Sequence, residues 1–230
     1  MKILFIGDVV GKSGRRALRR FLPELQDETE ADLTVVNAEN AAGGFGVTAG
    51  VLEEFLEQSE IDVLTSGNHI WDKREALDLI QDEPRLLRPH NYPEDTPGSG
   101  WIVATASNGV RVGVLNIMGT VFMHPTLDCP FSSANLAIEK KPSDVQAVLV
   151  DFHAEATSEK VAMGWYLDGR VSAVVGTHTH VPTADERVLP QGTAHISDVG
   201  MTGCYNSVIG METAGVLKRF VQRVPERFEV

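Results

Sequence analysis

Five short apolar runs of strand length in this 230-residue chain end at polar side chains. The residues that follow the runs are Asp8, Glu39 with Asn40, Asn68 with His69, His153, and His178 with His180. In the first half of the chain, segments with helical spacing of apolar residues separate the runs, which predicts alternating strands and helices. In such folds, ligands bind beyond the carboxyl ends of the strands. The sequence therefore predicts that these polar side chains meet at one edge.

The expected elements follow from apolar periodicity and turn residues. The expected strands are 2–7, 33–36, 61–64, 101–106, 110–117, 145–152, 171–176, 194–196 and 227–230. The expected helices are 15–25, 51–58, 72–80, a short one near 131, 158–167 and 213–221. Asn108-Gly109 predicts a hairpin between two of the strands. The pattern is typical of an α/β fold, a layered sandwich of mixed β-sheets flanked by helices.

Three local sequence signals predict where the helices kink or begin. Pro23 predicts a kink or restart in the first helix. Thr48 is placed to cap the second helix, and Asp72 with Glu75 resembles a capping box that opens the third. We expect a single domain over residues 1–230. The proline-rich stretch 84–100 leaves open a small insertion or cap around 84–131.

Composition narrows the class of protein. The net charge of -12 argues against an extended nucleic-acid surface but not against a small nucleotide substrate. Cys129 and Cys204 form no disulfide or zinc pattern, which fits a reducing cytoplasm. The first apolar run is too short for a signal peptide or a membrane span. Apolar segments are compatible with a homo-oligomer but do not identify an interface.

The stretch 171–180, VSAVVGTHTH, is read as a buried strand that runs into a polar edge. If the chain stays extended, the i, i+2 spacing puts His178 and His180 on one face, where they would converge on one cation. A lone Asp or Asn after a strand more often caps a turn, and His153 alone would be structural. The recurrence at five strand ends favours metal binding.

Oxygen and nitrogen ligands without thiolate suit Mn, Fe, Zn or similar borderline cations, and seven or eight ligands are too many for one ion. Two ions are therefore implied. A carboxylate such as Glu39 can bridge two ions about 3.5–4 Å apart around a hydroxide nucleophile.

Six motifs occur in an order that resembles the calcineurin-like metallophosphoesterases and, more narrowly, the bacterial YmdB-like phosphodiesterases. They are GDVVG at 7–11, NAEN at 37–40, GNHIWDK at 67–73, DFHAEATSEK at 151–160, VVGTHTHVPTAD at 174–185 and DVGMTG at 198–203. One departure from the superfamily is that the usual DxH reads Asp8-Val9-Val10. In the narrower group an amide replaces that histidine, and Asn40 stands at its position.

The resemblance implies a metallophosphoesterase-type sandwich with two divalent ions, Fe or Mn in the first place and Zn or Mg as alternatives. One ion would be held by Asp8, Glu39, Asn40 and His180. The other would be held by Glu39, Asn68, His153 and His178. His178 and His180 thus belong to different ions, which replaces the single-cation reading.

The resemblance also implies a phosphodiesterase acting on cyclic nucleotides such as 2′,3′-cyclic monophosphates, with a metal-bridging hydroxide as nucleophile. His69 would be the general acid, since imidazoles titrate close to neutral pH. Asp151 reads either as support for His153 or as a surface charge, and Gly176 as room for the substrate phosphate. Relatives usually continue beyond the position where this chain ends, which indicates a truncated chain or a shorter natural variant.

Two alternatives remain open. GDVVGKS at 7–13 resembles a P-loop, but three residues instead of four separate its glycines, and Ile6 stands where the first glycine should be. The other alternative is a regulatory or RNA-associated protein whose metals are structural. Such a protein would bind metals without turnover.

Overall fold

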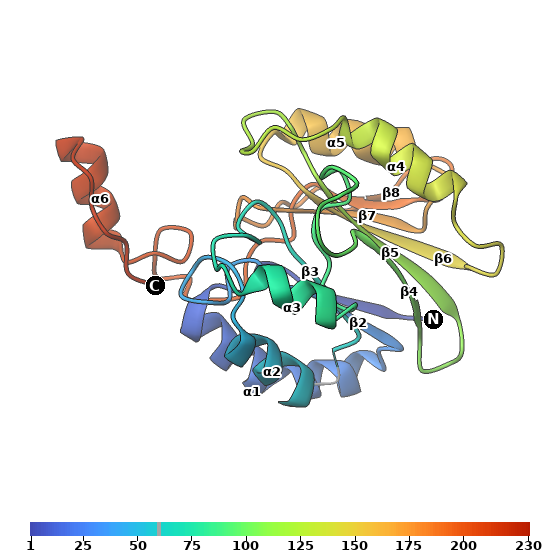
Figure 1. The fold of residues 1–230 in the computed structure, drawn as a ribbon, viewed down its shortest axis with the longest axis horizontal. Helices are drawn as coiled ribbons and strands as arrows, with labels where there is room; N and C mark the ends of the chain where they lie inside the picture. The colour runs from blue at the N-terminus through green and yellow to red at the C-terminus, as the bar shows by residue number, and fades with distance from the viewer. Residues whose placement is uncertain (59–60) are drawn as a thin grey trace.

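The computed structural model describes residues 1–58 and 61–230 and contains two β-sheets with helices on their outer sides (Figure 1). The first sheet has three parallel strands in the order β1-β2-β3. Its strands are β1 (Ile3–Ile6), β2 (Leu33–Asn37) and β3 (Val63–Thr65). The helices on its outer side are α1 (Gly11–Thr29), α2 (Ala49–Gln58) and α3 (Ala76–Asp82).

The second sheet has six strands in the order β4-β5-β6-β7-β9-β8. They are β4 (Trp101–Thr105), β5 (Arg111–Met118), β6 (Ala147–His153), β7 (Ala173–Thr177), β8 (Arg187–Val188) and β9 (Ala194–Ile196). The four central strands are parallel, and β4 and β8 pair antiparallel at the two edges. The helices α4 (Pro130–Glu139) and α5 (Thr157–Leu167) cover its outer face, whereas α6 (Thr213–Gln222) stands away from the sandwich (Figure 1).

Alternation along the strands produces three apolar layers. In β2, Val35 faces the second sheet and packs in one cluster with Val114 of β5, whereas Val36 faces α1 and α2. In β5, Val114 faces inward and Leu115 packs under α4 and α5. Successive strand side chains point to opposite faces, so each fully buried strand serves two layers. The predicted layered α/β sandwich with mixed sheets is confirmed.

Two helix starts differ by four residues from the sequence prediction. α1 begins at Gly11, four residues early, and includes Pro23 without ending there. Leu18 and Leu22, on the buried face of the helix, pack against the core just before that proline. α3 begins at Ala76, not at Asp72, so the predicted capping box is wrong.

The two residues of that box make other contacts, one local and one with a distant segment. The Asp72 carboxylate contacts the His69 ring, and Glu75 Oε2 accepts a hydrogen bond from Ala49 N at the start of α2. The cap at Thr48 is confirmed, because its hydroxyl accepts a 3.4 Å hydrogen bond from Val51 N.

The sequence prediction is correct for the hairpin and wrong for the end of the chain. The hairpin at Asn108-Gly109 is confirmed between β4 and β5. The strand expected at 227–230 is wrong: Glu229 O accepts one hydrogen bond from Glu212 N, and Val230 packs against Gly11. The two-residue strand β8 was not predicted.

Part of the stretch 84–131 belongs to the main sheet, because residues 101–118 contain β4 and β5. The preceding residues 85–87 run beside β3, where Leu64 bridges Leu86 in parallel. A cap formed by the remainder stays a prediction.

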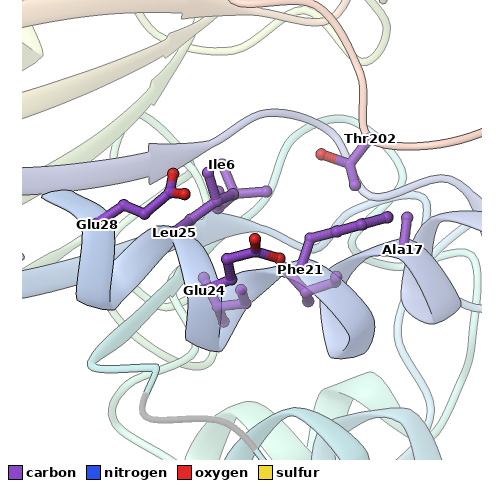
Figure 2. Close-up of a pocket in the computed structure, with 9 residues that line it drawn as sticks. Ile6, Ala17, Phe21, Glu24, Leu25, Glu28 and Thr202 are labelled. Atoms are coloured by element: carbon purple, nitrogen blue, oxygen red, sulfur yellow. The ribbon is translucent and has the colours of Figure 1, made fainter.

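An apolar groove of about 490 Å³ lies between α1 and the edge strand β1 (Figure 2). Ile6, Phe21 and Leu25 line it, with Glu24 and Glu28 beside them. It contains none of the predicted ligand residues. No helix in the described part of the chain is long and apolar enough to cross a bilayer.

Candidate metal centre

The predicted ligands gather where parallel strands of both sheets end, and three of them surround one imidazole nitrogen. His153, the last residue of β6, is fully buried. Its Nε2 lies 3.1 Å from Glu39 Oε1, 3.0 Å from Asn68 Oδ1 and 3.0 Å from His178 Nδ1. The loops after β2, β3 and β7 supply these three partners. With His153 they are the four residues that the sequence resemblance assigned to one ion.

A second group lies beside the first. His180 Nε2 is 3.2 Å from Asn40 Oδ1, and Asn40 is oriented by its Nδ2, which donates to Gly44 O. Asp8 adjoins the first group, because its Oδ2 accepts a 3.2 Å hydrogen bond from His178 N and its Oδ1 is 3.9 Å from His153 Nδ1. The structure thus separates His178 from His180. Assignment of each group to an ion remains a prediction.

The separation arises from the backbone after β7. The strand ends at Thr177, and φ is +103° at His178 and +65° at His180. The extended geometry expected from the i, i+2 spacing is therefore wrong. Left-handed backbone is unfavourable for residues with a side chain, so surrounding contacts must hold the turn.

A buried ion pair supplies those contacts. Asp198 Oδ2 accepts hydrogen bonds from both the backbone N and the hydroxyl of Thr179, at 3.1 and 2.8 Å. Lys160 Nζ lies 2.5 Å from the same oxygen, and both charged side chains are 2% exposed. The ion pair therefore holds Thr179, the residue between the two histidines, in place.

The charge of the centre fits divalent cations. Asp8 and Glu39 are buried, their ion pairs in the described chain are with histidine, and Asp8 Oδ1 and Glu39 Oε1 lack a hydrogen-bond partner. Burying a carboxylate without a nearby positive charge costs free energy. A bound cation would provide that positive charge. A Cβ at Gly67 would overlap both Glu39 Oε2 and the His153 ring, so only glycine leaves this space open.

Burial and mutual charge interactions shift the pKa values of the clustered side chains. Burial raises the pKa of Asp8 to about 6. Burial also opposes ionisation of Glu39, but His153 outweighs it and lowers the pKa of that carboxyl to about 2. Burial likewise disfavours charge on His153, yet Glu39 and Asp8 raise its pKa to about 9. Burial and then His153 lower the pKa of His178 to about 3.

We expect the metal-free protein to lose stability as the pH rises from 6.5 to 9. The raised pKa of His153 stabilises the fold below its unfolded value of 6.5, and this contribution disappears as the pH passes about 9. The loss is roughly 3 kcal/mol by proton linkage. Urea unfolding in the presence of chelator measures it. His153→Gln should flatten this part of the profile, and an equally steep profile in the variant would contradict the assignment.

Asp151 orients His153 from inside the sheet. Its side chain is fully buried, so the alternative that it is a surface charge is wrong. Thr177 Oγ1 donates to Asp151 Oδ1 at 2.7 Å and contacts His153 Nδ1 at 2.9 Å. Thr65 and Asn37 donate to the other carboxylate oxygen. Thr177, Thr65 and Asn37 were missed by the sequence reasoning, although Thr177 stands within GTHTH.

Thr177→Val is expected to weaken metal binding by about 10- to 100-fold, the usual effect of removing a group that orients a ligand. Valine keeps the shape but leaves His153 Nδ1 and Asp151 without their shared partner. Competition titration of metal-free protein with a chelating dye measures the affinity. Thr105→Val, at an exposed position of β4, is the matched comparison, and unchanged affinity in Thr177→Val would show that His153 needs no orientation.

Gly176 has a packing role. A Cβ there would overlap Ser197 O, and Val199 N donates to Gly176 O. The close approach is thus to the segment after β9, and room beside a substrate phosphate stays a prediction.

His69 lies outside the four-residue group. Its Nδ1 is 2.8 Å from Asp72 Oδ2, and its ring packs edge-on against Phe45 at 4.9 Å. The side chain is 26% exposed. With Nδ1 engaged, Nε2 is the nitrogen available to a ligand. The partner Asp72, three residues on, was read as a helix cap.

Comparison with known proteins identifies the family. A model of the family described as YmdB-like protein matches residues 4–230. The chain belongs to the YmdB-like family. The resemblance inferred from the six motifs is therefore confirmed.

Named relatives cover the whole chain. A Bacillus subtilis (strain 168) protein, 2′,3′-cyclic-nucleotide 2′-phosphodiesterase, is 50% identical over 230 residues, which are 100% of this chain and 86% of the relative. A Mycoplasma genitalium protein, a putative phosphatase/phosphodiesterase, is 37% identical over 100% of this chain and 83% of its own length.

Solved structures of similar sequence have the same fold. A hypothetical protein from Thermus thermophilus superposes with a TM-score of 0.93 at 43% identity, covering 100% of this chain and 88% of the other. A novel phosphatase of Mycoplasma pneumoniae gives 0.92 at 36% identity, over 100% and 83%. The sandwich is thus shared with these relatives along the whole chain.

Proposed function

We propose that this protein is a metal-dependent phosphodiesterase that hydrolyses nucleoside 2′,3′-cyclic phosphates. The observation that carries the proposal is the gathering of Asp8, Glu39 and His153 in a buried cluster without Lys or Arg partners among the described residues. The activity named for the Bacillus subtilis relative supports the substrate class.

The chain would hold two divalent ions, Fe or Mn in the first place and Zn or Mg as alternatives. One would take Asp8, Glu39, Asn40 and His180, and the other would take Glu39, Asn68, His153 and His178. Such ions supply charge neutralisation of the phosphoryl group and an activated water at neutral pH. Glu39 is common to both sets and would therefore be the ligand that links the two ions.

The side chains around the ions perform the remaining tasks. When the bond between phosphorus and the 2′ oxygen breaks, that oxygen needs a proton, and His69 Nε2 donates it. Asp72 Oδ2, 2.8 Å from the opposite ring nitrogen, orients the imidazole and leaves Nε2 as the nitrogen that faces the substrate. Asp151 and Thr177 hold His153 in the orientation that presents Nε2 to the cluster.

The test uses one protein sample for metal content and turnover. Chelator-treated protein should be inactive on 2′,3′-cyclic AMP and regain activity with Mn²⁺ or Fe²⁺. If the sample held two metals per chain and turned over no diester, a structural metal protein would replace the enzyme.

Lys12→Ala is the control for the P-loop alternative. Lys12 is exposed at the start of α1, and we expect its removal to leave diesterase activity unchanged. Calorimetric titration with nucleoside triphosphate is run on the same variant. Triphosphate binding that disappears together with diesterase activity would favour the P-loop reading instead.

A further inference from the structure

A second groove, of about 540 Å³, borders the loop that carries His69. Its walls include two aromatic rings, two prolines and a leucine: Trp71, Tyr92, Pro93, Pro125 and Leu127. The Trp71 and Tyr92 rings meet edge to face, with centroids 6.0 Å apart and planes at 83°. They form an apolar corner in the wall of the groove.

Three segments that leave the sheets at the metal-binding edge form these walls. Residues 85–87 run parallel to β3, since Leu87 N donates to Leu64 O, so Tyr92 and the His69 loop emerge at the same edge. Asn91 ties the third segment in place: its Nδ2 donates to Met118 O at the end of β5, and its Oδ1 accepts from Met118 N.

Backbone contacts place the groove beside the metal centre. His69 N donates a 3.3 Å hydrogen bond to Glu39 Oε2, so the loop that carries His69 borders the buried cluster. Trp71 follows His69 by two residues in that loop and lines the groove. A substrate held at the cluster can therefore extend along this loop toward Trp71.

The chemistry of the walls suits a base and not a phosphate. The described lining carries no Lys or Arg, and its one charged residue is Asp128. A phosphate would be repelled there, whereas every nucleobase has a π-face that stacks on aromatic side chains. Threonine hydroxyls at Thr96 and Thr126 offer polar contacts at the rim.

We propose that this groove holds the base of a nucleoside 2′,3′-cyclic phosphate, stacked against Trp71, while its phosphate lies at the metal centre. The inference rests on the proposed function for the placement of the phosphate. Trp71 and Tyr92 are then specificity-determining residues of the reaction.

The test compares two substrates of the metal-loaded protein, adenosine 2′,3′-cyclic phosphate and the baseless 1-O-methylribose 2,3-cyclic phosphate. Trp71→Ala should lower kcat/KM for the nucleotide about 5- to 100-fold, through KM, since stacking contributes this much per base. The baseless substrate should change less than about 2-fold. Trp71→Phe, which keeps a flat ring, should retain most of the nucleotide preference.

Trp71 also packs against the core under α1 and α2, so a second variant avoids that contact. Thr126 is exposed on the groove wall, and Thr126→Trp should fill the groove and produce the same selective loss. Equal losses on both substrates, or a wild type that does not prefer the nucleotide, would overturn the proposal.

Adenosine, which has no phosphate, separates this proposal from the proposed function. It should quench tryptophan fluorescence of the metal-free protein, and the quenching should persist in Trp165→Phe but vanish in Trp71→Phe. If no diester were hydrolysed, this quenching would still support the base groove. Absence of quenching up to the solubility of adenosine, in a protein that hydrolyses diesters, would refute the groove alone.

Discussion

Glu39→Gln is expected to abolish both metal binding and diesterase turnover. Glu39 is 1% exposed, contacts His153 and belongs to both predicted ligand sets. The amide keeps the shape but removes the charge that would hold two cations. Losing several kcal/mol of metal-dependent stabilisation, at about 1.4 kcal/mol per tenfold, corresponds to a fall in rate of at least about 10³-fold.

Elemental analysis and hydrolysis of 2′,3′-cyclic AMP measure the two effects in one preparation. Asp78→Asn is the matched control, because this acidic residue is exposed on α3 and removes the same charge elsewhere. A Glu39→Gln protein that retained two metals and most of its rate would exclude Glu39 as the shared ligand.

His69→Ala is expected to keep both metals and lose most of the rate on a poor leaving group. His69 bonds to Asp72 and lies outside the Glu39–His153–His178 cluster, so its removal leaves the predicted ligands intact. General acid catalysis contributes typically about 10²–10⁴-fold, which sets the expected loss on a cyclic nucleotide with its alkoxide leaving group. A nitrophenyl diester needs little protonation and should lose much less.

The comparison of leaving groups makes this result specific. Metal content of His69→Ala should equal that of the wild type, and Asp72→Asn should give a smaller loss with the same leaving-group trend. Equal losses on the alkoxide and nitrophenyl substrates would assign His69 to positioning instead of proton transfer.

Much of the fold was readable from local pattern. The apolar runs identified every strand of the parallel core, and Asn108-Gly109 located the antiparallel hairpin. The same runs placed Asp8, Glu39 and His153 at strand ends, because a buried parallel strand is apolar until it emerges at the edge. α3 starts at Ala76 and not at Asp72, whose carboxylate contacts the His69 ring three residues earlier in the chain instead of capping the helix.

The sequence by itself determined which side chains reach the edge of the sheets, and tertiary structure decided how they are arranged there. Spacing alone placed His178 and His180 on one face, but the Lys160–Asp198 pair holds the intervening residue in a turn that separates them. The polarity of Asp151 was visible, but its burial was not. Local periodicity reports which face a residue occupies within its own element, whereas orientation and desolvation depend on residues distant in the chain that the pattern does not encode.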